Sequence, residues 1–333
     1  MSKAFTHLDS IDFVKGLAAI SVILLHTLPG EVLRGTLAIY HIWQAVPIFI
    51  FLSFFLGFRH LEKTGDTIKA YYSKKRMKKL FMRVWLPLII LAVFESILFL
   101  GLGDNNRALR CLLCYGNGPG KYYIWCYMQI WLLIPIIFFL LKKMGILTGG
   151  SILLIISTLL CFVYEKWIGH SPGYSCFRYL FLGVPAYIYI KGVNIKKIMP
   201  FVVLSMIYLW VMRYIDVPEF ADPFLPDGWE IQTSLAFFYT LFLFMLLLKL
   251  FDRLEASKIK DYIIHLGKIS WEVFIVQMVL IGTGVLDYVG SRLFHASLFH
   301  VGFKVIAALV ITLSFAELYN RFLNSVIHIK NEG

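Results

Sequence analysis

The sequence is poor in charged residues and lacks the short motifs of common soluble enzymes. Only 16% of its 333 residues are Asp, Glu, Lys or Arg, whereas 59% are hydrophobic, and the mean hydropathy is +0.75. A soluble chain of this length would carry many more charges. No GxGxxG, Walker loop, HExxH or GxSxG sequence is present. This argues against the soluble nucleotide-dependent enzyme classes.

Cysteine is also scarce. Five cysteines do not make a disulfide framework, and the Cys111-x-x-Cys114 pair has no second pair or histidine at zinc spacing. The sequence therefore predicts no metal site. A disulfide between Cys111 and Cys114 is one interpretation of the pair, and two unremarkable cysteines is the one that we favour.

Apolar runs of about 20 residues dominate the chain, which is the length that a membrane-spanning helix needs. They predict an all-α, polytopic membrane bundle that forms a single domain over residues 1–333. We expect about ten spans, near residues 11–28, 38–58, 84–102, 121–141, 147–164, 174–191, 197–214, 231–250, 266–283 and 301–320.

Most of the 32 basic residues fall in alternate loops or at the span ends beside them, so the positive-inside rule predicts that both termini are cytoplasmic. The first apolar segment lacks a basic leader and a small-residue cleavage site, so we expect it to be retained. Basic loops beside anionic lipids account for the net charge of +12 without any nucleic acid.

The first apolar segment carries the most informative polar residues. Lys15 and His26 are eleven positions apart, which places them on one helical face about 16 Å apart along the axis. Ionisable side chains inside a membrane are costly and are functional candidates for that reason. The alternative is that His26 only packs between helices.

A basic stretch before the third span, within residues 58–87, has two interpretations. It can anchor the chain to anionic lipids and set its topology. Alternatively, Arg76 and Lys79, three apart on one helical face, join Lys15 in holding a phosphorylated cytosolic ligand.

Further polar residues lie in or beside the other spans. Several of them are expected to pair with one another inside the bundle, because unpaired charges there are costly. Those that we regard as candidate substrate contacts are His41, Ser53, Glu95, Arg178, Glu272 and Gln277.

Taken together, five segments resemble the acyltransferase-3 family of integral-membrane acyltransferases, which includes O-acetylases of surface polysaccharides. They are IDFVKGLAAISVILLHTL, VPIFIFLSFFLGF, KKRMKKLFMRVWLP, YYIWCYMQIWLLIP and LGKISWEVFIVQ. The resemblance covers most of the chain, and it rests on the order and spacing of the segments. It implies ten spans with both ends cytoplasmic.

The resemblance also implies roles for individual residues. Lys15 stands where the family has an arginine, and His26 matches a histidine that the family needs. The family's Arg-x-x-Arg appears as Arg76 and Lys79. The Ser-Gly-Phe ending of the second span becomes Ser53 followed by two phenylalanines, and Gln277 replaces a histidine that many members have.

The activity so implied is transfer of an acyl group, acetyl above all, from cytosolic acyl-CoA to a hydroxyl of a cell-surface glycan or lipid-linked sugar precursor. His26 would act as general base or carry the acyl group covalently. The expected partners are the glycan acceptor and membrane lipids, and a homo-oligomer is compatible with the sequence. The expected location is a bacterial cytoplasmic membrane. The alternative is an exporter or flippase of polysaccharide that makes no bond.

Overall fold

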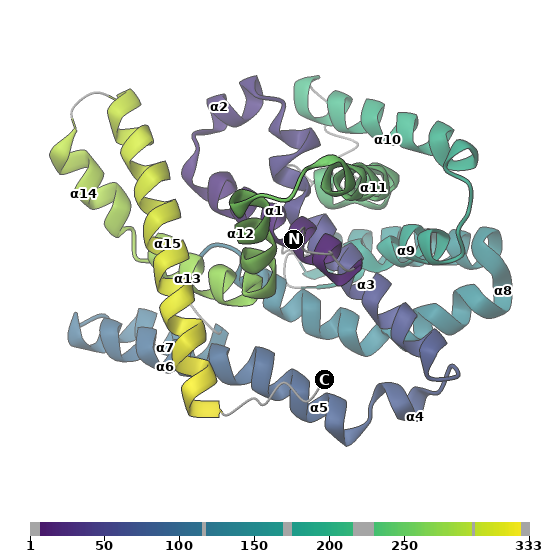
Figure 1. Cartoon of the computed structure of the whole chain (residues 1–333), viewed down its shortest axis with the longest axis horizontal. Helices are drawn as coiled ribbons and strands as arrows, with labels where there is room; N and C mark the ends of the chain where they lie inside the picture. Colours follow the sequence, from purple (N-terminus) through teal and green to yellow (C-terminus); the bar gives the residue numbers. More distant parts are fainter. Residues whose placement is uncertain (1–6, 115–117, 169–174, 216–229, 295–296, 328–333) are drawn as a thin grey trace. The chain divides into compact units, whose positions relative to one another are not determined.

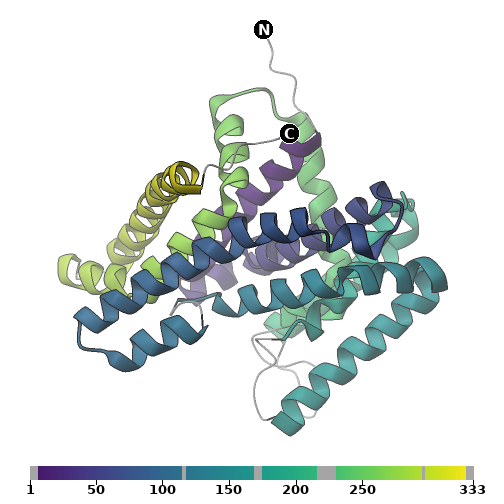
Figure 2. The ribbon, with the colours of Figure 1, turned by 90° about the horizontal axis from the view of Figure 1, so that it is seen from below.

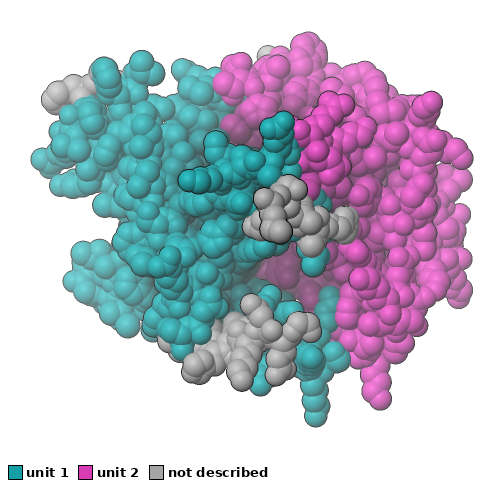
Figure 3. Space-filling model, viewed as in Figure 1, with its two compact units in different colours: residues 1–33, 73–121, 254–333 teal, residues 34–72, 122–253 magenta. Residues whose placement is uncertain are grey.

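The computed structural model describes residues 7–114, 118–168, 175–215, 230–294 and 297–327, and it is helical with no strand among them (Figure 1). The chain divides into two compact units, each assembled from separate stretches of sequence (Figure 3). Unit 1 comprises Met1–Leu33, Ser73–Lys121 and Leu254–Gly333, and unit 2 comprises Arg34–Tyr72 and Tyr122–Arg253. The expectation of a single domain stays a prediction.

Unit 1 contains the first helix, a block before and within the third apolar run, and the C-terminal helices. Its elements are α1 (His7–Thr27), α5 (Lys74–Leu80), the π-helical turn η3 (Phe81–Trp85), α6 (Leu86–Gly101), α7 (Asn105–Cys114), α12 (Lys258–Lys268), α13 (Ser270–Gly282), α14 (Val285–Leu293) and α15 (Ser297–Ile327). The short helix α2 (Gly30–Gly35) crosses the boundary to unit 2.

Unit 2 contains the second apolar run and the middle of the chain. Its elements are η1 (Ala38–Tyr40), η2 (Ile42–Gln44), α3 (Ala45–Lys63), α4 (Ile68–Tyr71), α8 (Lys121–Ile168), η5 (Phe177–Leu182), α9 (Gly183–Ile190), α10 (Ile195–Tyr214), η7 (Glu230–Gln232), η8 (Ser234–Ala236) and α11 (Phe237–Arg253). The first residue of α8 belongs to unit 1.

In unit 1, α1 packs against α12 at backbone distance, with the two helices antiparallel. A Cβ atom added to Gly16 would lie 2.0 Å from the carbonyl oxygen of Ile263, and one added to Gly267 would lie 1.7 Å from that of Asp12. Only glycine fits at either position, because a side chain would overlap backbone atoms that cannot move independently. These two glycines fix the position of α1 within the unit.

The C-terminal part of unit 1 turns sharply after α12. Helices α12 and α13 meet at Ile269 with a bend of 76°. Beyond the bend, α13 packs against α15, α1 and α6. Helices α6 and α7 lie side by side (Figure 2), and Ser96 Oγ donates to the carbonyl of Ala108 at 2.9 Å between them.

Unit 2 has an aromatic core around α3. Phe51 contacts Phe244 of α11 with ring centroids 4.9 Å apart, and Phe58 contacts Phe138 of α8 at 5.4 Å. Gly57 provides the close approach expected of a small residue there, since a Cβ atom on it would lie 2.7 Å from Ile134 Cγ2.

Helix α8 folds back on itself and forms two arms (Figure 2). The break is at Gly145, whose φ of 78° and ψ of 170° are not helical. Glycine adopts this positive φ without the steric cost that other residues have. The two arms correspond to the predicted spans near residues 121–141 and 147–164, and no separate loop element joins them.

Six helices are long and apolar enough to cross a membrane, or seven if the bent pair α12 and α13 is counted as one span, within the described residues. The predicted number of ten spans and the cytoplasmic location of both termini are therefore not confirmed. Nevertheless, each of the ten predicted segments coincides with helix in the structure. Helix α1, with Asp9, Asp12 and Lys15 in its first half, is not among the six.

Candidate functional site

Helix α1 carries Lys15 and His26 on one uninterrupted helix, as the apolar run predicted. Its rise places the two side chains about 16 Å apart along the axis. Both are partly exposed, and His26 lies in the last turn of the helix. The close packing of α1 on α12 holds both residues in unit 1.

Lys15 has a carboxylate partner that the sequence analysis did not identify. Its Nζ lies 2.7 Å from Asp12 Oδ1, three residues earlier, and the two side chains are 24% and 16% exposed. This ion pair orients the ammonium group and offsets part of its charge. A phosphate at this place would therefore compete with Asp12 for Lys15.

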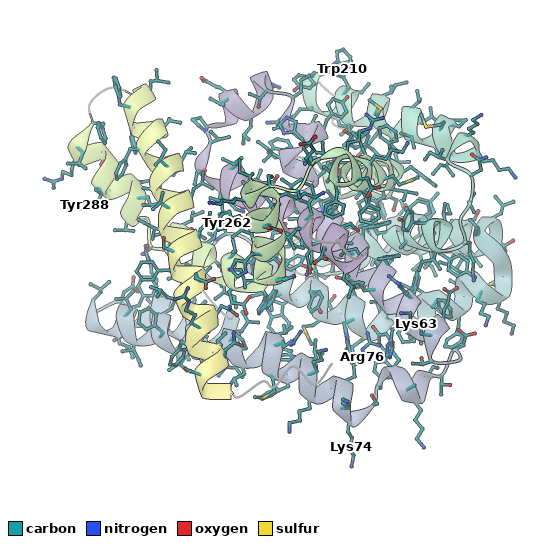
Figure 4. The ribbon with its side chains drawn as sticks, in the orientation of Figure 1. Lys63, Lys74, Arg76, Trp210, Tyr262 and Tyr288 are labelled. Carbon is teal, nitrogen blue, oxygen red and sulfur yellow. The ribbon has the colours of Figure 1, made fainter. Side chains whose placement is uncertain are left out.

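Arg76 and Lys79 lie on α5, three residues apart, as predicted. Arg76 is half-buried, whereas Lys74 on the same helix is exposed and points outward from it (Figure 4). Lys79 is exposed, and it lies close enough to Arg83 and Lys75 for their charges to interact. The helix continues into the π-turn η3, which carries Arg83. Such π-turns are frequent at functional sites.

Glu272, at the start of α13, lies between the Lys15 pair on α1 and the basic residues of α5 and η3 in electrostatic terms. It lies within electrostatic range of both Lys15 and Arg83, and Tyr319 of α15 is also within range of it. Tyr319 in turn donates a hydrogen bond of 2.8 Å to the carbonyl of Pro87. Segments from four parts of the sequence thus meet in unit 1.

We define the basic cluster as Lys15, Arg76, Lys79 and Arg83 with the carboxylates of Asp12 and Glu272. Arg76 is included because it lies three residues before Lys79 on α5. Four cations outnumber two carboxylates, which leaves an excess of positive charge. Arginine holds phosphate oxygens in a bidentate manner and lysine adds a mobile charge. The arrangement is therefore suited to a phosphorylated ligand. Sequence analysis did not assign Asp12 or Arg83 a role, although Arg83 lies in the basic stretch that it identified.

Two other candidates in unit 1 are fully buried. Glu95 of α6 and Gln277 of α13 both have an exposed fraction of 0%. The carboxamide of Gln277 has no hydrogen-bond partner for either its oxygen or its nitrogen among the described residues.

The three remaining candidates, His41, Ser53 and Arg178, belong to unit 2, whereas the catalytic and donor candidates belong to unit 1. The Nε2 atom of His41 is hydrogen-bonded to the carbonyl of Thr36 at 2.8 Å. The hydroxyl of Ser53 donates to the carbonyl of Phe49 at 2.9 Å within its own helix. These partners account for both residues as local structure. Their predicted contact with substrate stays a prediction.

Arg178 is only 4% exposed and belongs to a buried polar group that sequence reasoning missed. Its charge interacts with Tyr122 and Tyr179, and Tyr179 donates to Gln232 Oε1. The carboxamide nitrogen of Gln232 lies 3.4 Å from the Tyr122 hydroxyl. The available signal was the set of polar residues within the aromatic run that opens the fourth predicted span, but their partners are distant in sequence.

Among the cysteines, Cys111 of α7 and Cys126 of α8 are buried, and Cys126 Sγ lies 3.1 Å from the carbonyl of Ser175. The side chain of Cys114 lies outside the part of the chain that the structure describes, so the Cys111 and Cys114 pair is untested.

Comparison with known proteins identifies the family. Comparisons with curated proteins and with solved structures found no match. The family model described as an acyltransferase domain, that of acyltransferase-3, matches residues 8–317, which is nearly the whole chain and includes both units. This confirms the resemblance seen in the sequence. With its apolar helices and this match, the chain is a multi-pass membrane protein that belongs to the acyltransferase-3 family.

Proposed function

We propose that the protein transfers an acyl group, acetyl in the first instance, from cytosolic acyl-CoA to a hydroxyl of a cell-surface glycan or its lipid-linked precursor. The bacterial cytoplasmic membrane is the proposed location. The observation that carries the proposal is the family match together with α1, which holds His26 and Lys15 on one continuous helix beside further cations.

The basic cluster supplies the donor end of the proposed site. The phosphates of acyl-CoA would contact Lys15, Arg76, Lys79 and Arg83, and the narrow pantetheine arm would extend along α1 toward His26. The helical rise of about 16 Å between Lys15 and His26 is a suitable reach for that arm. Acyl-CoA is here a co-substrate, and the proposal includes no metal.

His26 has two chemical routes. As general base, it takes the proton of the acceptor hydroxyl while the oxygen attacks the thioester carbon, the C–S bond breaks, and the proton passes to the CoA thiolate. As acyl carrier, its ring nitrogen attacks the thioester carbon, the C–S bond breaks, and CoA leaves as a thiolate. The acceptor oxygen then attacks the acyl carbon, the C–N bond breaks, and the hydroxyl proton balances the charge of the CoA thiolate. Both routes end in one ester and one CoA thiol.

The test is release of CoA thiol by protein in lipid nanodiscs supplied with acetyl-CoA and a cell-envelope glycan extract. We expect His26→Ala to abolish release. His265→Ala is the matched control, because His265 lies in the same unit and its Nε2 is hydrogen-bonded to Glu317 Oε2 at 2.8 Å. Binding of acetyl-CoA without any His26-dependent release would contradict catalysis, and export of glycan by His26→Ala would favour a transporter.

The same assay without acceptor separates the two routes. An acyl-histidine intermediate predicts a burst of CoA that approaches one equivalent per protein. A general base predicts no burst, because no bond changes until the hydroxyl is bound.

A further inference from the structure

Two polar side chains in unit 1 are fully buried and make no hydrogen bond to any residue that the structure describes. They are Gln277 of α13 and Thr312 of α15, each with an exposed fraction of 0%. Both carboxamide atoms of Gln277 and the hydroxyl of Thr312 lack a partner among the described residues. A buried polar group left unsatisfied typically costs about 1–3 kcal/mol. Native proteins satisfy most such groups, so these exceptions require an explanation.

Thr312 differs from other helical hydroxyls in the described part of the chain. Buried serine and threonine in a helix commonly donate to a carbonyl one turn earlier. Ser21 and Thr27 do so in α1, at 2.9 and 2.8 Å, and Ser53 does so in α3 at 2.9 Å. The Thr312 hydroxyl is not used in this way, and it remains available to another group.

The packing of α13 on α15 places the two residues at similar heights. The helices pack together and run in opposite directions, since Glu272 lies near Tyr319 at one end, and Asp287, just past α13, pairs with Lys304 at 2.6 Å at the other. Gln277 is about 7.5 Å along α13 from Glu272, and Thr312 is about 10.5 Å along α15 from Tyr319.

Both residues also belong to the buried faces of their helices. Thr312 lies between Ala308 and Ala316, which are four residues away on either side and have an exposed fraction of 0%. Gln277 follows Val273, also 0% exposed, by four residues. Residues four apart share one helical face, so both polar groups face the interior of the unit.

We propose that Gln277 and Thr312 form a neutral hydrogen-bonding site for an amide of the pantetheine arm of the acyl donor. An amide needs both a donor and an acceptor, and a carboxamide and a hydroxyl each supply both. No charge is required, in contrast to the basic cluster. Gln277 lies about 7.5 Å beyond Glu272 along α13, and Glu272 is within electrostatic range of Lys15 and Arg83, so Gln277 is within reach of an arm that starts at the phosphates.

This inference rests on the proposed acyl-CoA donor, and its test compares CoA with adenosine 3′,5′-bisphosphate. The second ligand has the adenosine of CoA and two of its three phosphates but no pantetheine. We would measure the dissociation constants of both by calorimetry with protein in nanodiscs. The variants are Gln277→Leu and Thr312→Val, which keep the side-chain size, with Thr312→Ser as the control that retains a hydroxyl.

We expect Gln277→Leu and Thr312→Val each to weaken CoA binding by about 3- to 10-fold, the factor that one neutral hydrogen bond supplies. Binding of the bisphosphate should not change, and Thr312→Ser should bind CoA like the wild type. Thr312→Val should also unfold no more easily than the wild type, because it removes an unsatisfied buried hydroxyl.

Several results would overturn the inference. Unchanged CoA binding in both variants would show that the donor does not use these groups, and an equal loss for both ligands would indicate damage to the unit as a whole. A higher KM for the glycan acceptor with unchanged CoA binding would assign the site to a sugar hydroxyl. If wild-type protein binds neither ligand, the proposed donor itself is wrong, and this is visible before any variant is compared.

Discussion

Replacing Gly267 by alanine should separate α1 from α12 and thereby disturb the helix that carries Lys15 and His26. The added Cβ atom would lie 1.7 Å from the carbonyl oxygen of Asp12, whereas ordinary contact begins at 3.4 Å. The obstacle is backbone, so no side-chain rotation relieves it. The helices must therefore move apart by more than about 1 Å, as the contact distances require.

The expected cost follows from the loss of close packing. Overpacking a dense interface by one methyl group typically costs about 1–3 kcal/mol, and a backbone obstacle places Gly267→Ala at the upper end. The carbonyl that must move belongs to Asp12, whose carboxylate holds Lys15 at 2.7 Å. The variant should consequently lose donor affinity as well as stability.

The assay is unfolding of purified protein in mixed micelles with increasing sodium dodecyl sulfate, followed by intrinsic fluorescence. Gly302→Ala is the matched control, since it lies in α15 of the same unit and a Cβ atom there would meet nothing within 4 Å. We expect a clear loss for Gly267→Ala and none for Gly302→Ala. Equal midpoints would refute the backbone contact between α1 and α12.

Three further predictions concern individual pairs. Asp12→Asn should lower the KM for acyl-CoA by up to about 5-fold. A partly exposed ion pair contributes up to about 1 kcal/mol, and in the variant Lys15 does not have to break its ion pair with residue 12 before it contacts a phosphate. An unchanged or higher KM would argue against a phosphate contact at Lys15. Lys191 Nζ donates to Glu62 at 2.6 Å, and this hydrogen bond raises the pKa of Lys191. Lys191→Met should therefore lower the unfolding free energy by less than about 1 kcal/mol, and this loss should be constant up to pH 10.5 and disappear as the pH rises through the raised pKa. A loss that vanishes at neutral pH would contradict this. Tyr179→Phe removes the hydroxyl that donates to Gln232 and should destabilise the protein by about 0.5–1.5 kcal/mol. The same unfolding assay measures this loss, with Tyr262→Phe as the control because Tyr262 is exposed. Equal midpoints for the two variants would contradict the buried network.

The sequence was a good guide wherever the evidence is local. Apolar runs predicted helix at all ten segments, and spacing predicted that Lys15 and His26 share one helix and that Arg76 and Lys79 share another. Each of these inferences depends on residues a few turns apart, whose geometry the helix itself sets.

What the sequence did not predict depends on long-range packing. The approach of Glu272 to Lys15 and Arg83 requires a bend of 76° between α12 and α13, and no proline or glycine pair marks that bend. The reversal within α8 was missed for a local reason, because one glycine, Gly145, takes a non-helical φ and ψ and turns the chain without a separate loop element. The family match confirms the class of protein, whereas the roles of individual residues stay predictions.

The interrupted make-up of unit 1 has a consequence for how the protein is made. Helix α1 leaves the ribosome first, but Ile263 and Gly267, against which it packs, are synthesised more than 230 residues later. Contacts so distant in sequence form slowly, because a long loop must close before they do. During most of translation the helix with Lys15 and His26 therefore lacks its final neighbour. A ribosome stalled before α12 should hold a nascent chain that contains His26 and yet binds no acyl donor.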